Sequence, residues 1–553
     1  MNGYFLGIDA GTGSIRAAVF DSEGQLLGNS EAAYSTYYPK NGWAEQDTDE
    51  WLRALETAVP ACLRDAGVSP SDIRSIVCDA TTCTLVFLDE QDEPVRRPLL
   101  WMDVRAVEEA RELDELRYGP YGVAQEPDGL RYGPGGEAQG NGPAASDGRA
   151  QSLFPAMDVY LPNFRADTMI PKCMWMKRHE RTLWDRTRTI FEFEDWLNFM
   201  LTGEKTLSTS VAAFRWNYDA GLGGLPVGLY VKAGIGDVKE KIPARELSIG
   251  EPVGTVTKEA AARFGLSEGT PVFEGSCDCN AAMLGTGCVS EGSIVLVSGT
   301  STAILGLSDV PFHTAGVNGT YPDCIFPGTG LAESGQTASG AILTWFRNTL
   351  LPTAWAEEAE RRGMNVYDLI TEKAAGAPIG CGGVLMLDYF QGNRAPYADS
   401  SARGSFVGLS IGTDAACIAR AIYEGVAFGA AHCVRVMQES GMRIERVLAC
   451  GGITSSPFWL QMHADVLGLP ITTAEMSAHC PPLGDALIGA AACGVYTNVP
   501  EAAKDMVRAG TTYLPDPEAH KKYRFYMDRY LELWPALEST VHRLVEHENM
   551  NIQ

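Results

Sequence analysis

The stretch that decides the fold covers residues 9–16 and reads Asp9-Ala10-Gly11-Thr12-Gly13-Ser14-Ile15-Arg16. It lies between two apolar segments, residues 4–9 and 15–20, and each segment predicts a β-strand. Glycines let the backbone approach a ligand closely, and successive amides in such a turn can converge on an anion. The two hydroxyl side chains add donors, and Arg16 adds a guanidinium. The stretch therefore predicts a β-meander whose first turn binds phosphate.

A second turn repeats this design in the other half of the chain. It reads Ser298-Gly299-Thr300-Ser301-Thr302 and joins the strand-like segments 293–297 and 303–307. Either turn alone would fit an ordinary hairpin. Two of them in separate α/β halves predict a duplicated fold that grips one polyphosphate from both sides. No Gly-Lys-Ser/Thr follows at the Walker spacing, so this is a different kind of phosphate site.

The rest of the chain alternates helix-like and strand-like segments, which indicates an α/β protein. Helices are predicted over residues 48–66, 104–116, 415–437 and 457–467, and short strands over 75–77 and 85–88. We expect an N-terminal domain over residues 1–268, a second domain over 269–500, and closing helices over 501–553 packed on the second domain. A Gly- and Pro-rich tandem repeat at residues 116–143 predicts a surface loop.

Composition narrows the class of protein. The 553 residues carry a formal net charge of −26, which would repel nucleic acid and anionic membranes. No apolar run of about 18 residues occurs and no export signal is recognisable, so we expect a soluble, cytoplasmic protein without nucleic-acid or membrane partners. Most of the 14 cysteines should be reduced and packed in the core. Because alternate residues of a strand face opposite ways, Cys277-Asp278-Cys279 is not predicted to bind a metal.

Several motifs, taken in order, resemble the FGGY family of carbohydrate kinases, within the superfamily of actin and hexokinase. They are Gly7–Arg16, Gly42–Asp47, Trp101–Arg105, Gly275–Gly285, Gly299-Thr300, Gly392–Pro396, Arg420–Gly425 and Gly451-Gly452. The resemblance implies two actin-like (ribonuclease H-like) α/β domains around a central cleft, with the sugar mainly on the first domain and ATP mainly on the second. It also implies Mg²⁺ as a cofactor, a small-molecule sugar as substrate, and a homodimer.

The resemblance assigns the general base to Asp278. Phosphorylation of a sugar hydroxyl needs a carboxylate that orients the hydroxyl and accepts its proton. Asp278 lies in Gly275-Ser276-Cys277-Asp278-Cys279-Asn280-Ala281-Ala282, which is similar to the Gly-x-x-Asp-x-x-x-Ala motif of the family. Without the resemblance, Asp278 would fit a helix N-cap equally well.

Polar residues similar to those of the ribulokinase-like subgroup are expected to bind the sugar. They are Thr82, Trp101, Asp103, Arg215 and Glu333, together with Asp278. Trp101 could instead be a core residue. Arg215 stands where the subgroup usually has lysine, and its guanidinium is broader and planar, so the identity of the sugar stays open.

The nucleotide and its metal are expected to contact the glycine-rich turns. The expected ATP-binding residues are Gly11, Thr12, Gly13, Ser14, Arg16, Gly299, Thr300, Gly340, Gly451, Gly452 and Ser456, and Asp9 is expected to hold Mg²⁺ through water. Asp485 departs from the glutamate usual before Ala-Leu-x-Gly-Ala-Ala, and the sequence offers no interpretation of this change.

The function that follows is ATP-dependent phosphorylation of a small sugar, a ketopentose such as ribulose, at a terminal hydroxyl. Xylulose, erythrulose, erythritol and a signalling furanose precursor are alternatives within the kinases. An actin-like ATPase that needs no sugar, such as a chaperone or filament protein, is the alternative from another class. It would need a client domain or a polymer surface, and the sequence shows no additional domain.

Overall fold

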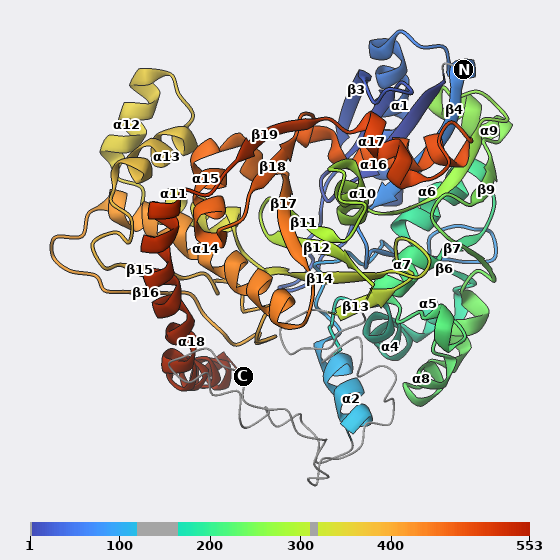
Figure 1. The fold of residues 1–553 in the computed structure, drawn as a ribbon. Coiled ribbons are helices and arrows are strands. Elements are labelled where there is room, and N and C mark those ends of the chain that lie inside the picture. Colours follow the sequence, from blue (N-terminus) through green and yellow to red (C-terminus); the bar gives the residue numbers. More distant parts are fainter. Residues whose placement is uncertain (1–2, 119–163, 310–318, 553) are drawn as a thin grey trace.

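The computed structural model describes residues 3–118, 164–309 and 319–552 (Figure 1). Most of the tandem repeat at 116–143 lies outside these residues. The first sheet has six strands in the order β3 (Leu26–Ala33), β2 (Ser14–Phe20), β1 (Tyr4–Ala10), β4 (Ile73–Ala80), β10 (Pro271–Cys277) and β9 (Pro252–Thr255). The second has seven, in the order β13 (Gly319–Pro322), β14 (Gly330–Gln336), β12 (Thr302–Ser308), β11 (Gly292–Ser298), β17 (Ile444–Cys450), β18 (Ile471–Ala474) and β19 (Ala509–Tyr513).

The two sheets repeat one topology. Each contains an antiparallel three-strand meander, β1-β2-β3 in the first sheet and β11-β12-β14 in the second. Two strands then continue each sheet in parallel, β4 and β10 beside β1, and β17 and β18 beside β11. The predicted meander and the predicted duplication are confirmed. Both glycine-rich turns therefore connect the first two strands of their meanders.

Helix α1 (Thr48–Ala66) shows why the predicted helices form. Asp47 caps its N-terminus by accepting a hydrogen bond from the amide of Asp49 at 3.0 Å, and Gly67 ends it in the left-handed conformation. The buried residues Trp51, Leu55 and Val59 recur at a spacing of four and face the first sheet. The helix spans the predicted residues without any shift.

The remaining elements extend the two halves of the molecule. Those of the first half are β5 (Leu85–Leu88), α2 (Val107–Tyr118), α4 (Met169–His179), α5 (Arg181–Arg186), β6 (Thr189–Glu192), α6 (Phe193–Thr202), β7 (Thr206–Ser208), α7 (Thr209–Arg215), α8 (Val227–Lys232), β8 (Arg245–Leu247), α9 (Lys258–Phe264) and α10 (Asp278–Gly285). Those of the second half include α11 (Gly340–Thr349), α12 (Thr353–Arg362), α13 (Val366–Gly376), β15 (Leu385–Leu387), β16 (Ser405–Val407), α14 (Ala415–Glu439) and α15 (Pro457–Leu467). Helices α14 and α15 confirm the helices predicted at 415–437 and 457–467.

One helix from late in the chain returns to the first sheet. Helix α16 (Cys480–Ala492) packs on β1, β4 and α10, and Figure 1 shows it beside the N-terminal strands. Glycines make this approach close: a Cβ at Gly7 would lie 2.3 Å from the carbonyl oxygen of Pro482, and one at Gly484 would lie 2.1 Å from that of Ala281. A single apolar core, with Phe5 from the first sheet and Leu305 from the second, therefore joins the two sheets around α10 and α16.

The pairing of β10 bears on the expected division into domains. This strand belongs to the first sheet, yet it follows the boundary that the sequence suggested between residues 268 and 269. We propose that the first domain extends through α10 to residue 285 and that the second begins at β11. The segment after residue 500 contains α17 (Val499–Met506), strand β19 and helix α18 (Pro517–Ile552), and α18 packs on α14 and α15.

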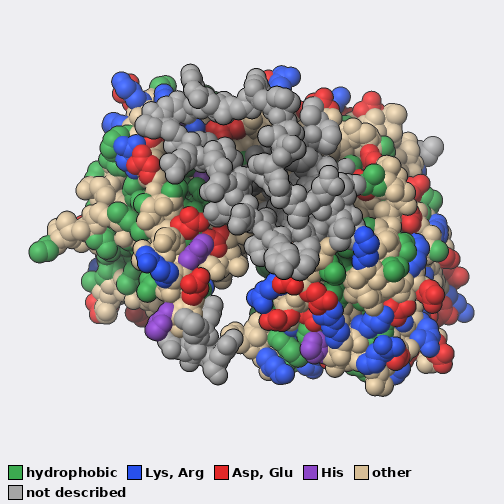
Figure 2. All heavy atoms as spheres, turned by 90° about the horizontal axis from the view of Figure 1, so that it is seen from below, with side chains coloured by type: hydrophobic (Ala, Val, Ile, Leu, Met, Phe, Trp, Pro, Cys, Tyr) green, Lys and Arg blue, Asp and Glu red, His purple; other side chains and the backbone are tan. Residues whose placement is uncertain are grey.

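The surface has a mixed charge pattern. On the face seen in Figure 2, acidic and basic side chains alternate over the part of the molecule that contains α4, α5 and α8. Within the ranges that the structure describes, no helix combines the length and the apolar character needed to cross a membrane.

Candidate functional site

Hydrogen bonds to backbone carbonyl oxygens hold the first glycine-rich turn in place. The Gly11 amide donates to the carbonyl of Ser14 at 3.0 Å, and the Tyr34 amide donates to the carbonyl of Gly13 at 3.1 Å. The Gln46 side chain donates to the carbonyl of Thr12 at 2.6 Å, and the Tyr34 hydroxyl donates to that of Gly11. These contacts use carbonyl oxygens, while Gly13 is exposed. The turn is therefore fixed mainly through its carbonyl oxygens, and two of its donors, the Gly11 amide and the Ser14 hydroxyl, are engaged by Ser14 and Glu31.

The predicted nucleotide residues of the second half come together around the second turn. Gly340 donates its amide to the carbonyl of Gly299 at 3.0 Å, and a Cβ at Gly340 would lie 2.5 Å from that oxygen. Gly451 has a positive φ of 82°, and a Cβ there would lie 2.6 Å from the carbonyl oxygen of Ser298. Three glycine-containing segments thus meet at one place, where Thr300 and Gly452 are exposed.

Ser456 lies at the far end of the turn that begins at Gly451. Its hydroxyl caps α15 by accepting a hydrogen bond from the amide of Trp459 at 3.3 Å. The side chain therefore has a structural task, and its contact with ATP stays a prediction.

Carboxylates gather below the first turn. Asp9 is the last residue but one of β1 and is the register partner of Asp79 on β4, while Asp278 is the first residue of α10. Asp9 is fully buried and forms an ion pair with Arg16. Burial raises the pKa of Asp9, and the Arg16 guanidinium acts to lower it. Burial, with the nearby charge of Asp9, raises the pKa of Asp278 to about 7.

Asp485 gains an interpretation from its place on α16. It is fully buried on α16, which packs on β1 and β4, and it interacts with Asp79 and Asp9. Burial, followed by the charge of Asp485, raises the pKa of Asp79 well above its usual value. The departure from the family pattern therefore keeps a carboxyl group at this position, on a side chain one methylene shorter than glutamate, close to Asp79 and the predicted metal ligand Asp9. The sequence analysis gave Asp485 no role and did not list Asp79 among the site residues.

The predicted sugar residues Arg215 and Glu333 contact each other. The Arg215 guanidinium donates to both carboxylate oxygens of Glu333, at 2.9 and 3.0 Å, and the Tyr321 hydroxyl also donates to Glu333 at 2.9 Å. Both partners are almost fully buried. Burial alone would raise the pKa of Glu333, but the Arg215 charge and hydrogen bonds hold it at about 2. Sequence reasoning missed Tyr321, which no motif marks.

More charges surround this pair. Arg165 forms an ion pair with Asp167, and both Arg165 and Arg394 act electrostatically on Glu333. Burial lowers the pKa of Arg394, and the positive charge of Arg165 lowers it further. Arg394 belongs to a quoted motif, whereas Arg165 and Asp167 gave no signal in the sequence. A cluster of planar donors thus surrounds Glu333, one of the residues expected to bind the sugar.

The other predicted sugar residues differ in how far their side chains are already hydrogen-bonded within the protein. Trp101 is half-buried outside the apolar core, and its indole donates to the Thr12 hydroxyl at 3.0 Å, which links the sugar side to the first turn. Thr82 has a buried hydroxyl oxygen without a hydrogen-bond partner among the described residues. The carboxylate of Asp103 is already engaged by Arg105, at 2.7 and 2.8 Å, and by the Ala44 amide, at 2.6 Å. Its direct contact with sugar stays a prediction.

The expectation that Cys277 and Cys279 face opposite ways is wrong. It assumed a strand, but α10 begins at Asp278, so Cys277 and Cys279 do not face opposite ways. Their sulfur atoms are 3.5 Å apart. Ligand atoms of Cys277, Asp278 and Cys279 all lie within 4.8 Å of one another.

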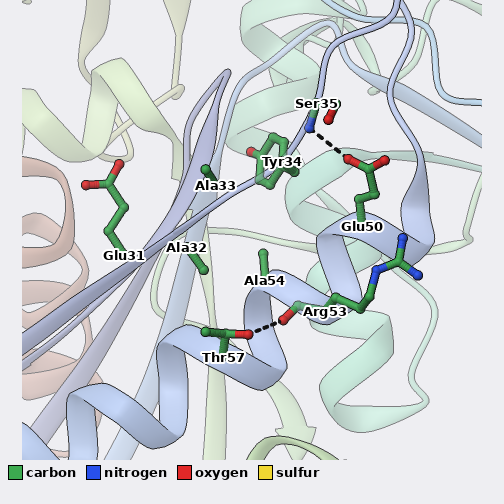
Figure 3. A pocket seen from close by; sticks show the side chains of 9 residues that line it. All are labelled: Glu31, Ala32, Ala33, Tyr34, Ser35, Glu50, Arg53, Ala54 and Thr57. Atoms are coloured by element: carbon green, nitrogen blue, oxygen red, sulfur yellow. Dashed lines mark hydrogen bonds between the residues drawn. The ribbon is translucent and has the colours of Figure 1, made fainter.

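A separate hollow lies on the outer side of the first sheet. It has a volume of about 550 Å³ and lies between β3 and α1 (Figure 3). Its lining residues are Glu31, Ala32, Ala33, Tyr34, Ser35, Glu50, Arg53, Ala54 and Thr57. None of them is a predicted site residue, although the Ser14 hydroxyl donates to Glu31 at the edge of the hollow.

Comparison with known proteins shows which protein family this chain matches. Models of the N-terminal and C-terminal domains of the FGGY family of carbohydrate kinases match residues 4–125 and 161–285, and residues 294–493. The chain is 30% identical to ribulokinase 2 of Staphylococcus saprophyticus, covering 97% of each chain. It is 29% identical to a ribulokinase of Anoxybacillus flavithermus, covering 96% of this chain and 94% of the relative.

Solved structures give the same fold. The ligand-bound xylulose kinase of Lactobacillus acidophilus superposes with a TM-score of 0.82 at 20% identity, covering 98% of this chain and 99% of that one. The predicted pair of actin-like, ribonuclease H-like α/β domains is confirmed.

Proposed function

Because the chain belongs to the FGGY family of carbohydrate kinases, which use ATP as phosphate donor, we propose that it phosphorylates a ketopentose such as ribulose at a terminal hydroxyl. The observation that carries the proposal is the position of Asp278. This carboxylate is under the influence of Asp9 and Arg16 on the phosphate side and of Arg215 on the sugar side. The two predicted sets of ligands therefore meet at one carboxylate.

In the proposed reaction, Asp278 accepts the proton of the attacking hydroxyl. The hydroxyl oxygen forms a bond to the γ-phosphorus, the bond from that phosphorus to the β,γ-bridging oxygen breaks, and ADP leaves. A base with a pKa near 7 is well suited to this step at neutral pH. Arg215 and Glu333 orient the sugar by hydrogen bonding, and the two glycine-rich turns hold the polyphosphate.

Asp9 is the side chain that would hold Mg²⁺. Its carboxylate is fully buried, forms an ion pair with Arg16 and interacts with the Asp79 side chain, and carboxylate oxygens are the ligands that Mg²⁺ prefers. The ion would supply charge neutralisation on the phosphates. Asp9→Asn should raise the Mg²⁺ concentration needed for half-maximal rate by about 10-fold or more. An unchanged Mg²⁺ requirement would contradict this assignment.

Likeness to ribulokinases over nearly the whole chain supports a ketopentose, and the Glu333 region supports it further. A coupled assay of ADP release over ribulose, xylulose, erythrulose, erythritol and glycerol tests it. We expect kcat/KM to be highest for ribulose. A higher kcat/KM for another compound of this set would make that compound the substrate and would leave the assignment as a kinase unchanged. Equal ADP release with and without every sugar would overturn the proposal.

A further inference from the structure

The segment around Asp278 places two thiols beside the proposed base. Because α10 begins at Asp278, the backbone turns between Cys277 and Cys279 and brings their sulfur atoms to 3.5 Å. A ligand oxygen of Asp278 lies within 4.8 Å of both sulfurs. Cys277 is fully buried, whereas Asp278 and Cys279 are half-buried. A small solute that reaches the base can therefore reach Cys279 as well.

A third thiol lies close to this group. The Cys324 sulfur accepts a hydrogen bond from the Asn280 side chain at 3.7 Å and interacts electrostatically with Cys277 and Cys279. Cys324 is almost fully buried and is not one of the mutually close ligand atoms. Cys277, Asp278 and Cys279 thus offer two sulfur ligands and one carboxylate oxygen, which are ligand types that Zn²⁺ binds.

The spacing of the two sulfurs also fits an ion. Two thiolates bound to a tetrahedral Zn²⁺ at about 2.3 Å lie roughly 3.8 Å apart. The observed 3.5 Å is close to this value, so only a small movement is needed to admit the ion. Burial raises the pKa of Cys277 well above its usual value, so binding must displace its proton.

We propose that Cys277, Asp278 and Cys279 bind a thiophilic divalent cation, Zn²⁺ or Cd²⁺, which engages the Asp278 carboxylate and inhibits phosphoryl transfer. The binding of the ion does not depend on the reaction. The inhibition rests on the proposed role of Asp278, because a carboxylate bound to a metal ion cannot accept the proton of the sugar hydroxyl.

Cd²⁺ titration of the full-length protein, without nucleotide, tests the binding. The readout is the ultraviolet absorption of cadmium–thiolate bonds, which does not require catalysis. We expect one ion per chain and at least a 10-fold loss of affinity in Cys279→Ser. Cys417→Ser is the matched control, because Cys417 is also half-buried but lies in the first turn of α14 and does not belong to the ligand group around Asp278. Equal titrations for wild type and Cys279→Ser would overturn the site.

A second measurement needs no variant. Cd²⁺ should protect Cys279 of the wild-type protein from alkylation by iodoacetamide, as read by peptide mass spectrometry. Alkylation of Cys279 at the same rate with and without Cd²⁺ would overturn the site even if Cys279→Ser did not fold.

Zn²⁺ inhibition of each variant, normalised to its own activity without zinc, tests the second part. We expect wild type and Cys417→Ser to lose activity reversibly on addition and removal of Zn²⁺, and Cys279→Ser to resist it at least 10-fold better. Normal Cd²⁺ binding without any inhibition would overturn the inhibition and contradict Asp278 as base. Absence of cadmium–thiolate absorption in the wild-type protein would overturn only the proposed metal site and would leave the assignment of Asp278 as base unchanged.

Discussion

Arg215 and Glu333 come from different halves of the chain, on α7 and β14, and pair through two hydrogen bonds of 2.9 and 3.0 Å. The guanidinium also lies over the Phe214 ring, 3.4 Å from its centroid. The pair is therefore fixed in orientation before a sugar binds. A bidentate contact of this type depends on the planar fork of arginine, which lysine lacks.

Arg215→Lys should change which sugar is preferred. Lysine restores the residue usual in the ribulokinase-like subgroup and leaves one Glu333 oxygen free to accept a hydrogen bond from a substrate hydroxyl. We expect the ratio of kcat/KM between ribulose and xylulose to change by about 10-fold or more. Arg347→Lys, at a half-buried position of α11 outside the predicted site, is the control. An unchanged ratio would remove Arg215 from the sugar pocket.

The rate should depend on the ionisation of Asp278. Since burial and Asp9 raise its pKa to about 7, lowering the pH below 7 protonates the base. We expect kcat/KM to fall about 10-fold for each pH unit below that value. Asp278→Asn should reduce kcat by about 100-fold or more, remove this pH dependence, and leave ATP binding intact. A fully active Asp278→Asn variant would refute the assignment of the base.

Gly340→Ala should weaken ATP binding selectively. The new Cβ would lie 2.5 Å from the carbonyl oxygen of Gly299, so α11 and the second turn must move apart. We expect the KM for ATP to rise about 10-fold while the KM for sugar stays within about twofold. Gly376→Ala is the control, because a Cβ there meets nothing within 4 Å. Equal effects of the two substitutions on the KM for ATP would contradict the role of Gly340.

Glu274 should make the stability of the protein depend on pH. Burial raises its pKa from 4.5 to about 8, so the folded protein holds a proton that the unfolded chain releases. The stabilisation is complete below about 4.5 and is lost as the pH rises through about 8. Thermal unfolding midpoints should therefore fall with pH over this window in wild type, and less steeply in Glu274→Gln. The exposed Glu268→Gln is the control, and identical slopes for all three proteins would rule the effect out.

Much of the fold could be predicted because local signals agree with it. The glycine-rich turns sit between short apolar runs, and α1 has a capping aspartate, a buried stripe and a terminal glycine at the predicted positions. In each half, the glycines predicted to bind the nucleotide also lie together, as the order of motifs suggested. These features depend on neighbouring residues, which a sequence displays directly.

The features that sequence patterns did not reveal depend on where the chain turns and on how segments pack together. The place where β10 gives way to α10 decides that Cys277 and Cys279 meet, and strand periodicity gave the opposite answer. The carboxylate of Asp103 is engaged by Arg105, a contact that the sequence pattern did not reveal, and the contact of Asp103 with sugar stays a prediction. Arg165 and Tyr321 interact with Glu333 only because of tertiary packing, and no sequence pattern near either residue predicts these interactions.

The return of α16 to the first sheet has a consequence for biosynthesis. A ribosome releases the strands of that sheet early, but their helix partner, residues 480–492, emerges only after nearly nine-tenths of the 553 residues have been made. Until then the surface around Gly7 stays uncovered. Domains of large proteins usually fold in the order of synthesis. Here the earliest sheet must wait for one of the last helices, so nascent chains interrupted before residue 480 should depend on chaperones to remain soluble.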